Sequence, residues 1–339
     1  MTHKRICVVG AGVIGLSSAV RIQNQIPDAD ITIVADKFSP NTTSDGSAGF
    51  WEPHLVNPIQ KQEIRKWGQE TFDHLLRLAS SEEAGKLGAQ LISGYNFCLM
   101  KEEPFWKDQV LAYRKLDENE KKIHPEHKDG VFFTTVSIDV KSYLPWLMQK
   151  FKANGGKVQF RTIASIYELS SDFDIIVNCV GVQANRLLGD EEVKPVRGQV
   201  MTVYAPWIKH FIIDFDVEGK DNEAYIIPGR DCVTLGGTGQ EGNWNTNVDS
   251  KDANKIFESC VKLVPSLKNA KKISDWVGLR PGRTTVRLEI EEIHGSKKGM
   301  VIHNYGHAGS GVTLHWGCAG DTVQLVQAAL KRLSLTSSL

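Results

Sequence analysis

A glycine-rich loop near the N-terminus has the residue types and the spacing that suit the binding of a dinucleotide. Its sequence is Gly10-Ala11-Gly12-Val13-Ile14-Gly15, which follows a β-branched run and fits the pattern G-x-G-x-x-G. The first glycine permits a tight turn, the second lets the backbone approach a pyrophosphate, and the third lets a helix pack on a strand. The helix N-terminus then offers N–H groups and a partial positive charge to the phosphates.

A carboxylate and a hydroxyl-rich segment follow this loop. Asp36 lies twenty-one residues beyond Gly15, where it can hold ribose hydroxyls. The segment after it, KFSPNTTSDGSAGFWEP, is rich in small and hydroxyl side chains, which suit further phosphate contacts and a flat ring system. Nicotinamide-binding folds usually continue with a helix and more parallel strands, whereas this chain continues with a long loop. The sequence predicts a site for FAD or NAD(H), and the long loop favours FAD.

The elements that must position these residues alternate between strands and helices. Apolar periodicity predicts a β-α-β unit from strand 6–9, helix 13–23 and strand 30–35. After residue 143, helices and strands alternate again. Further helices are expected at 61–78, at 143–152, after a Ser250 cap and at the C-terminus, and further strands at 157–160, 174–180 and 300–303. Strands at 199–204, 223–227 and 232–236 are joined by turn-rich segments, which indicates an antiparallel sheet.

The predicted fold class is α/β, with a Rossmann-like cofactor-binding domain and an inserted α+β domain whose sheet is mainly antiparallel. We expect residues 1–50, 140–190 and 272–339 to form the discontinuous cofactor domain. Residues 51–139 and 191–271 would form the substrate-binding domain. A chain of 339 residues is long enough for such an arrangement.

Composition excludes several classes of function. The chain has 40 Lys and Arg against 40 Asp and Glu, so its net charge is zero, which argues against binding to nucleic acid or to an anionic membrane surface. Its longest apolar run is shorter than the roughly 18 residues of a membrane span, so we expect a soluble protein. The six cysteines include no C-x-x-C pair and several lie in apolar runs, which indicates reduced, buried thiols.

Five segments together resemble the family of D-amino-acid oxidases and D-aspartate oxidases, from about Arg5 to the last helix. They read NTTSDGSAGFWEP, VRGQV, AYIIPG, VGLRPGR and HNYGHAGSGVTLHWG. The resemblance implies an FAD enzyme that oxidatively deaminates D-amino acids by passing a hydride from Cα to flavin N5. Dioxygen would then reoxidise the flavin, so that the products are hydrogen peroxide, ammonia and a 2-oxo acid. The expected partners are therefore a small D-amino acid and dioxygen.

The resemblance also implies roles for individual residues. Arg280 would grip the substrate carboxylate through two parallel N–H donors, Tyr225 would add a hydroxyl, and the Gly309 carbonyl would accept from the substrate amine. The start of the last helix would face the flavin pyrimidine oxygen, where its dipole stabilises the anionic reduced flavin. The residues expected to hold the cofactor, besides the glycine loop, are Asp36, Lys37, Thr43, Ser44, Gly49, Phe50, Ile163, Gly311, Val312 and Thr313.

Departures from the family pattern bear on the side chain that the substrate carries. Asp221 occupies the neighbourhood where amino-acid oxidases usually carry a second lid tyrosine, and Ile213 and Gly239 stand where aspartate oxidases carry arginines. Without these cations a second substrate carboxylate would be left unpaired. His54 and the segment PVRGQV, in contrast, resemble the corresponding residues of the D-aspartate oxidases. We expect neutral D-amino acids as substrates, with Glu52 and Asp221 suggesting basic ones as well, and D-aspartate as the alternative.

The sequence leaves three other functions open: an FAD oxidase for glycine or sarcosine, a nicotinamide-dependent dehydrogenase, and a dinucleotide-binding module without activity.

Three short motifs do not predict a functional site. His124-Pro125-Glu126-His127 reads as an exposed turn, Gly306 breaks the helical spacing that a metal pair at His303 and His307 would need, and Gly236-Gly237-Thr238-Gly239 reads as a hairpin bend. No metal is expected.

The C-terminal tripeptide Ser337-Ser338-Leu339 resembles the peroxisomal S-K-L address without its basic residue. A frayed serine-rich tail is the competing interpretation. A reaction that produces peroxide favours the peroxisome, where catalase is present, over the cytoplasm. The sequence leaves open a homodimer and recognition by a peroxisomal import receptor.

Overall fold

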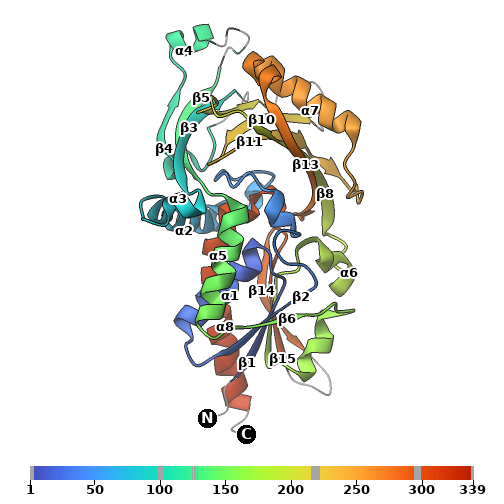
Figure 1. Ribbon diagram of the computed structural model, residues 1–339. Helices are drawn as coiled ribbons and strands as arrows, with labels where there is room; N and C mark the ends of the chain where they lie inside the picture. The colour runs from blue at the N-terminus through green and yellow to red at the C-terminus, as the bar shows by residue number, and fades with distance from the viewer. Residues whose placement is uncertain are drawn as a thin grey trace.

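The computed structural model describes residues 4–97, 103–123, 125, 127, 129–214, 222–293 and 299–336. These residues form two sheets that lie one above the other in Figure 1, with both ends of the chain beside the lower sheet. The lower sheet has the strand order β14-β15-β7-β1-β2-β6. Its strands are β1 (Arg5–Val9), β2 (Asp30–Ala35), β6 (Lys157–Phe160), β7 (Ile175–Asn178), β14 (Arg287–Ile293) and β15 (Gly299–Tyr305).

The lower sheet is parallel except for β14, which pairs antiparallel with β15 at one edge. Its central strands are continuous apolar runs, because a parallel sheet is covered on both faces. Ile6 of β1 pairs with Ile31 of β2 on one side and with Ile175 of β7 on the other, and all three are buried. This register aligns the carboxyl ends of the strands, where the loops that carry the glycines begin.

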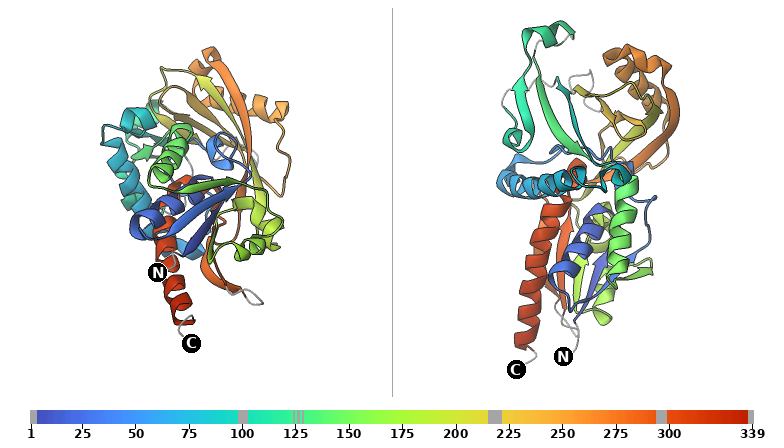
Figure 2. Two further views of the ribbon diagram at one scale, coloured as in Figure 1. Left: turned by 60° about the horizontal axis from the view of Figure 1, so that its bottom comes forward. Right: turned by 60° about the vertical axis from the view of Figure 1, so that its left-hand side comes forward.

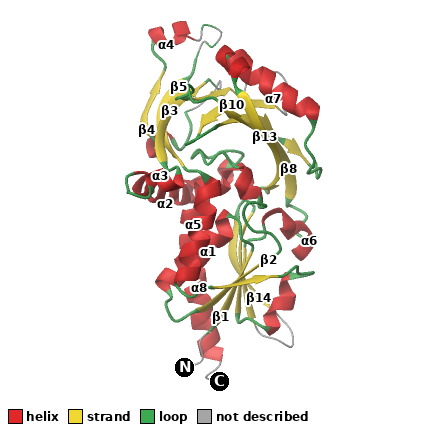
Figure 3. Cartoon of the chain, viewed as in Figure 1, coloured by secondary structure: helices red, strands yellow, loops and turns green. Residues whose placement is uncertain are grey.

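Three helices lie together along one side of the lower sheet: α1 (Val13–Gln25), α5 (Val140–Ala153) and α8 (Gly311–Thr336). Helix α1 packs between the other two. The short helix α6 (Ala184–Leu188) follows β7 on the other side, as Figures 1 and 3 show. Both α1 and α8 begin where the two sheets meet, so their N-termini reach the same region of the molecule.

The upper sheet has the order β12-β8-β11-β10-β9-β3-β5-β4, and β13 also pairs with β8. All its pairs are antiparallel except β3 with β9. Helix α7 (Ser250–Leu263) packs on β8, β10 and β11. The strands are β3 (Gln90–Asn96), β4 (Leu111–Lys115), β5 (Val131–Ser137), β8 (Lys194–Tyr204), β9 (Phe211–Asp214), β10 (Asn222–Pro228), β11 (Val233–Thr238), β12 (Gln240–Glu241) and β13 (Lys271–Gly282), and the remaining helices are α2 (Lys61–Ala79), α3 (Ala84–Leu87) and α4 (Glu118–Ile123).

The predicted fold class is confirmed: a mainly parallel sheet flanked by helices is joined to a second, mainly antiparallel sheet. Strand β13, which the predicted division assigns to the cofactor domain from residue 272 onward, pairs along β8 in the upper sheet. The division into residue ranges stays a prediction. Among the described helices, none combines the length and the apolar character that crossing a membrane requires.

Two local predictions were wrong. The cap of α7 is Asp249, whose carboxylate accepts from the N–H groups of Lys251 and Asp252, because a carboxylate one residue earlier reaches the free N–H groups better than Ser250 does. The Gly236–Gly239 segment is not a hairpin bend. Strand β11 continues to Thr238, and Gly236 pairs with Tyr225 on one side and with Val200 on the other.

Candidate active site

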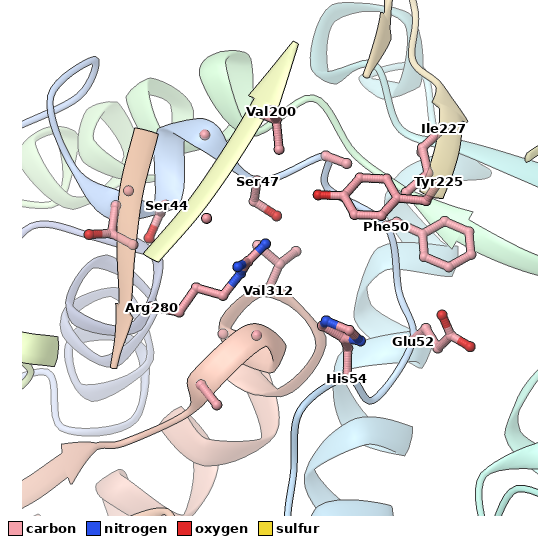
Figure 4. Close-up of a pocket in the computed structure, with 18 of the residues that line it drawn as sticks. Ser44, Ser47, Phe50, Glu52, His54, Val200, Tyr225, Ile227, Arg280 and Val312 are labelled. Carbon is pink, nitrogen blue, oxygen red and sulfur yellow. The ribbon is translucent and has the colours of Figure 1, made fainter. Parts of the chain in front are cut away.

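A cavity lies where the lower and upper sheets meet. Its walls come from the loop after β2, the segment around residues 50–54, strands β8, β9, β10 and β13, and the start of α8. Figure 4 shows that most of the labelled side chains extend into this space from opposite sides. Its described lining is Val13, Thr43, Ser44, Gly46, Ser47, Ala48, Phe50, Glu52, His54, Gly198, Val200, Ile213, Tyr225, Ile227, Trp276, Gly278, Arg280, Ala308, Gly309, Gly311 and Val312.

Arg280 reaches the cavity from β13, where the two-residue period of a strand puts it on the same face as Gly278 and Trp276. Its guanidinium lies flat over Gly198 of the neighbouring strand, where a Cβ would come within 2.4 Å of Nη1. Nη1 donates to the carbonyl oxygen of Thr238 at 2.8 Å. Within the described parts of the chain, no carboxylate forms an ion pair with Arg280, although the side chain is half-buried. The cavity therefore offers a guanidinium to an anionic ligand.

Tyr225 enters the same cavity from β10. Its ring lies over Gly236, where a Cβ would come within 1.9 Å of the ring carbon that carries the hydroxyl. Figure 4 shows the ring beside Phe50 and the hydroxyl directed into the cavity, toward the side of Ser47. The neighbouring wall is apolar and includes Ile213 and Ile227. A hydroxyl and a guanidinium thus face one space whose remaining surface on this side suits carbon rather than charge.

The segment that follows Phe50 forms the opposite wall and is held by the start of α8. The Thr313 hydroxyl accepts from the N–H of Glu52 at 3.3 Å and donates to its carbonyl at 2.8 Å. The Ser310 hydroxyl does the same for His54, with both bonds at 2.7 Å. Gly309 approaches His54 so closely that a Cβ would lie 2.6 Å from the imidazole. Both Glu52 and His54 line the cavity.

A second cavity lies over the carboxyl ends of β1, β2 and β7. It is lined by the glycine loop, by Asp36 and Lys37 at the end of β2, and by Ile163. Five residues line both cavities: Val13, Thr43, Ser44, Ala308 and Gly311. The two cavities therefore form one elongated cleft, with the nucleotide-binding loop at one end and Arg280 at the other.

The residues of the second cavity fit FAD. Gly10 has a φ of +105°, and a Cβ there would lie 2.5 Å from the carbonyl oxygen of Cys179, so the tight turn requires glycine. Helix α1 begins at Val13, and Gly12 before it offers no side-chain cap. The Ser44 hydroxyl accepts from the Val13 N–H at 3.0 Å, so a hydroxyl and a helix N-terminus lie together where phosphate would bind. Among the described residues, buried His307 Nε2 finds no hydrogen-bond partner, and His307 lines this cavity. An elongated dinucleotide would reach each of these groups.

A buried chain of polar rings supports the start of α8 below the cleft. His315 Nδ1 lies 2.6 Å from the carbonyl oxygen of Val312, Tyr143 Oη lies 3.0 Å from His315 Nε2, and His74 Nε2 lies 2.8 Å from Tyr143 Oη. A carbonyl only accepts, so His315 donates from Nδ1 and accepts from Tyr143, which in turn accepts from His74. His74 also stacks on Trp316 at 3.7 Å.

Burial keeps the histidines of this region neutral. Loss of hydration lowers the pKa of His74 to about 2, with the neighbouring His315 as a further cause. Burial likewise lowers the pKa of His315 to about 4 and that of His307 to about 3. The hydrogen-bond directions in the chain agree with neutral rings, because each ring uses one nitrogen as a donor.

Three predicted cofactor residues do not line either described cavity. Gly15 lies against the Gly10 carbonyl, where a Cβ would be at 2.0 Å, so it allows the helix to pack on the strand. Gly49 has a φ of +71° and lies against the Ile138 carbonyl. Thr313 is buried and holds the Glu52 backbone. Asp221 lies outside the described residues, and the other predicted site residues line one cavity or both.

The prediction missed Trp276, Ser47 and Val200 in the first cavity and Arg161, Arg186 and Tyr305 in the second. Two signals could have found some of them. Strand periodicity from Arg280 points to Trp276 on the same face. The rule that ligands bind beyond the carboxyl ends of parallel strands points to Arg161, which directly follows β6.

The remaining sequence motifs lie elsewhere. Within the described ranges, no cluster of three His, Cys, Asp or Glu side chains could hold a metal ion. Of the 124–127 motif, His124 and Glu126 lie outside the described residues, and His127 stacks on Phe97 at 4.2 Å. The described cysteines Cys7, Cys179, Cys232, Cys260 and Cys318 are free thiols. The C-terminal tripeptide at 337–339 also lies outside the described part.

Comparisons with known proteins agree with this geometry. The model of a family described as FAD dependent oxidoreductase matches residues 5–325. The chain is 43% identical to D-aspartate oxidase from Homo sapiens, covering 98% of this chain and 97% of that protein, and 37% identical to D-amino acid oxidase from Dugesia ryukyuensis, covering 97% and 99%. Its fold matches the crystal structure of glycine oxidase from Bacillus cereus with a TM-score of 0.74, at 18% identity, over 96% of this chain and 95% of the other.

Proposed function

The chain belongs to the family of FAD-dependent oxidoreductases, and on that premise we propose that it oxidatively deaminates D-amino acids, with dioxygen as the electron acceptor. The overall reaction consumes the amino acid, dioxygen and water and yields a 2-oxo acid, ammonia and hydrogen peroxide. Its full-length relatives named D-aspartate oxidase and D-amino acid oxidase support the proposal.

The observation that carries the proposal is the half-buried guanidinium of Arg280, which faces the cavity without a carboxylate partner among the described residues. A planar fork of N–H donors fixes both the position and the orientation of a carboxylate. The Tyr225 hydroxyl adds a donor from the adjacent wall, and the Gly309 carbonyl accepts from the amine. Arg280 and Tyr225 hold the carboxylate, Gly309 holds the amine and the apolar wall receives the side chain, so three substituents of Cα are placed in one handedness.

FAD, when bound, supplies the acceptor for the two electrons of the Cα–H bond. This chain's contribution is orientation and electrostatics rather than acid–base chemistry. Gly311 and Val312 bring the N-terminus of α8 to the point where the two cavities join, and the positive end of a 26-residue helix there stabilises negative charge. The hydrogen bonds from Ser310 and Thr313 fix that helix end to the substrate wall.

We propose neutral D-amino acids as the preferred substrates. Arg280 is the single Lys or Arg in the described lining of the substrate cavity, and Ile213 makes the wall near Tyr225 apolar. A second substrate carboxylate would lie near Glu52, where like charges repel. The alternative is D-aspartate oxidation, which the 43% identity to human D-aspartate oxidase favours.

We propose the peroxisome as the location of the enzyme, because the reaction yields hydrogen peroxide and the tripeptide Ser337-Ser338-Leu339 resembles the S-K-L import signal. Binding of that tripeptide to a peroxisomal import receptor accompanies this proposal. Deletion of the tripeptide would shift a fluorescent fusion from peroxisomes to the cytosol. A homodimer is proposed as the assembly, and sedimentation of the holoenzyme tests it.

A spectrum of the purified protein tests the function. We expect a yellow protein. Its flavin absorption should bleach when D-alanine is added without oxygen and should persist when L-alanine is added. Turnover with D-alanine, D-aspartate and N-methylglycine then ranks the substrate classes. Faster turnover of D-aspartate would replace the neutral preference by the alternative, and a colourless protein or a spectrum that no D-amino acid changes would contradict the proposal.

A further inference from the structure

Within the described lining of the substrate cavity, Glu52 is the single carboxylate and Arg280 the single guanidinium. Figure 4 shows them on opposite sides of the cavity, with Arg280 rising from β13 and Glu52 from the segment that follows Phe50. Phe50, Ile213 and Ile227 supply apolar surface to the same cavity. A ligand that carries an anion at one end, a cation at the other and methylenes between them matches this distribution of charge.

The position of Glu52 is fixed from several directions. Thr313 binds both its backbone N–H and its carbonyl. The preceding residue, Trp51, is fully buried and donates its indole N–H to the Gly68 carbonyl at 3.1 Å. The side chain of Glu52 is itself 8% exposed, and buried Asn96 donates to Oε1 at 3.2 Å. A carboxylate held this firmly can discriminate between ligands, since little is lost in ordering it.

We propose that Glu52 is a specificity-determining residue that accepts the side-chain cation of basic D-amino acids such as D-lysine, D-ornithine and D-arginine. The inference rests on the proposed function and names a substrate class for it. The α-carboxylate pairs with Arg280, the methylenes lie along the apolar wall, and the terminal ammonium or guanidinium pairs with Glu52. Burial of a charged side chain is costly unless a fixed opposite charge receives it, and Glu52 supplies that charge.

Matched substrates separate this role from a general effect on the site. D-Lysine and D-norleucine differ by the terminal ammonium, and D-arginine and D-citrulline differ by the charge of the end group. In the holoenzyme, Glu52→Gln is expected to lower the ratio of kcat/KM for D-lysine over D-norleucine by about tenfold or more, which is the size of a charge-assisted hydrogen bond. The ratio for D-arginine over D-citrulline falls in the same direction, and Glu52→Asp restores part of both.

Glu63→Gln is the matched control, because it makes the same chemical change on the exposed surface of α2, outside the cavity. It is expected to leave both ratios unchanged. Equal losses for D-lysine and D-norleucine in Glu52→Gln would overturn the inference, because Glu52 would then act on the α-amine that all substrates share. An unchanged ratio would overturn it as well.

A binding measurement on the unmodified holoenzyme needs no variant. 5-Aminopentanoate and glutarate have similar lengths and end in opposite charges, and both can be followed by the perturbation of flavin absorption. We expect 5-aminopentanoate to bind about tenfold or more tightly than glutarate, and the reverse order would overturn the inference. Oxidation of D-norleucine but not of D-lysine defeats this inference alone, whereas a folded yellow protein that oxidises no D-amino acid defeats the proposed function.

Discussion

The two ends of the cleft recognise their ligands by different structural means. The nucleotide end is formed mainly by backbone: a glycine loop with Gly10 at a φ of +105° and the N-terminus of α1. The substrate end is formed by side chains that lie over glycines of neighbouring strands, with Arg280 over Gly198 and Tyr225 over Gly236. The first end is encoded within a few consecutive residues, while the second depends on strand pairing between distant segments.

Because the two ends are built separately, substrate preference can change without loss of the cofactor site. A side chain at the substrate end can be exchanged while the glycine loop and the parallel strands stay as they are. The start of α8 is the exception, because Gly311 lines both cavities and Ser310 and Thr313 bind the substrate wall. Substitutions at the two ends should therefore affect substrate turnover and flavin binding separately.

The largest effect is expected from Arg280→Met. Loss of the guanidinium leaves the substrate carboxylate without its charged partner, so kcat/KM for D-alanine should fall by about 10³-fold. The variant should still purify with flavin, because Arg280 lies outside the second cavity. Oxygen consumption and the flavin-to-protein absorbance ratio measure the two quantities. Turnover within a few-fold of the unmodified enzyme would break the assignment of the substrate end.

Gly10→Ala should produce the opposite pattern. The added Cβ would lie 2.5 Å from the Cys179 carbonyl oxygen in a backbone conformation that disfavours side chains, so the loop must shift away from the pyrophosphate position. FAD affinity should fall by about 100-fold, as measured by fluorescence titration of the apoprotein.

Gly155→Ala is the matched control for Gly10→Ala. Gly155 also has a positive φ, of +83°, but nothing lies within 4 Å of the Cβ position. Both variants carry backbone strain, and the Gly10 variant alone disturbs the cleft. Equal flavin affinity in the two variants would show that the glycine loop does not form the nucleotide end.

The sequence predicted the nucleotide end more fully than the substrate end, because the first is encoded by consecutive residues and the second by the pairing of distant strands. The loop from Gly10 to Gly15, the helix after it and Asp36 at the end of β2 follow one another along the chain, so spacing alone located them. Trp276 and Val200 line the first cavity together because β13 pairs with β8, which brings these two residues into register. No local pattern records that pairing, and the resemblance to a known family supplied Arg280 and Tyr225.

Thr313 and Gly49, which the resemblance assigns to the cofactor, do not line either described cavity. Their neighbours in the chain, Val312 and Phe50, do line the first cavity. One residue along a helix turns a side chain by about 100°. Thr313 therefore points to the Glu52 backbone instead, and Gly49 lies against Ile138. Such contacts follow from packing between segments and cannot be read from spacing.

Ile213→Arg tests whether the apolar wall sets the preference for neutral side chains. Ile213 is buried in β9, pairs in register with Tyr225 and lines the substrate cavity. A guanidinium there would give a second substrate carboxylate a partner, so the kcat/KM ratio of D-aspartate over D-alanine should rise about tenfold. Ile213→Met keeps the wall apolar and should leave the ratio unchanged. A ratio that the arginine does not raise would argue against this wall as the determinant.

The smallest effect concerns the histidines below α8, where the two ends of the cleft meet. Burial lowers the pKa of His74, His307 and His315 to about 2, 3 and 4, whereas unfolded histidine titrates near 6.5. Below that value the unfolded state takes up protons that the folded state does not, so stability is complete above about pH 6.5 and falls as the pH drops. Between pH 7 and 5.5 the free energy of unfolding should fall by about 1 kcal/mol per histidine.

Urea unfolding of the holoenzyme at pH 7 and 5.5 measures this loss, and His74→Gln should make it smaller by about 1 kcal/mol because one buried titrating group is removed. His210→Gln removes an exposed histidine of the upper sheet instead and should leave the loss as in the unmodified protein. The comparison separates the buried chain under α8 from histidines in general. The same pH dependence in all three proteins would mean that His74 titrates in the folded state, and the neutral chain from His74 through Tyr143 to His315 would then be wrong.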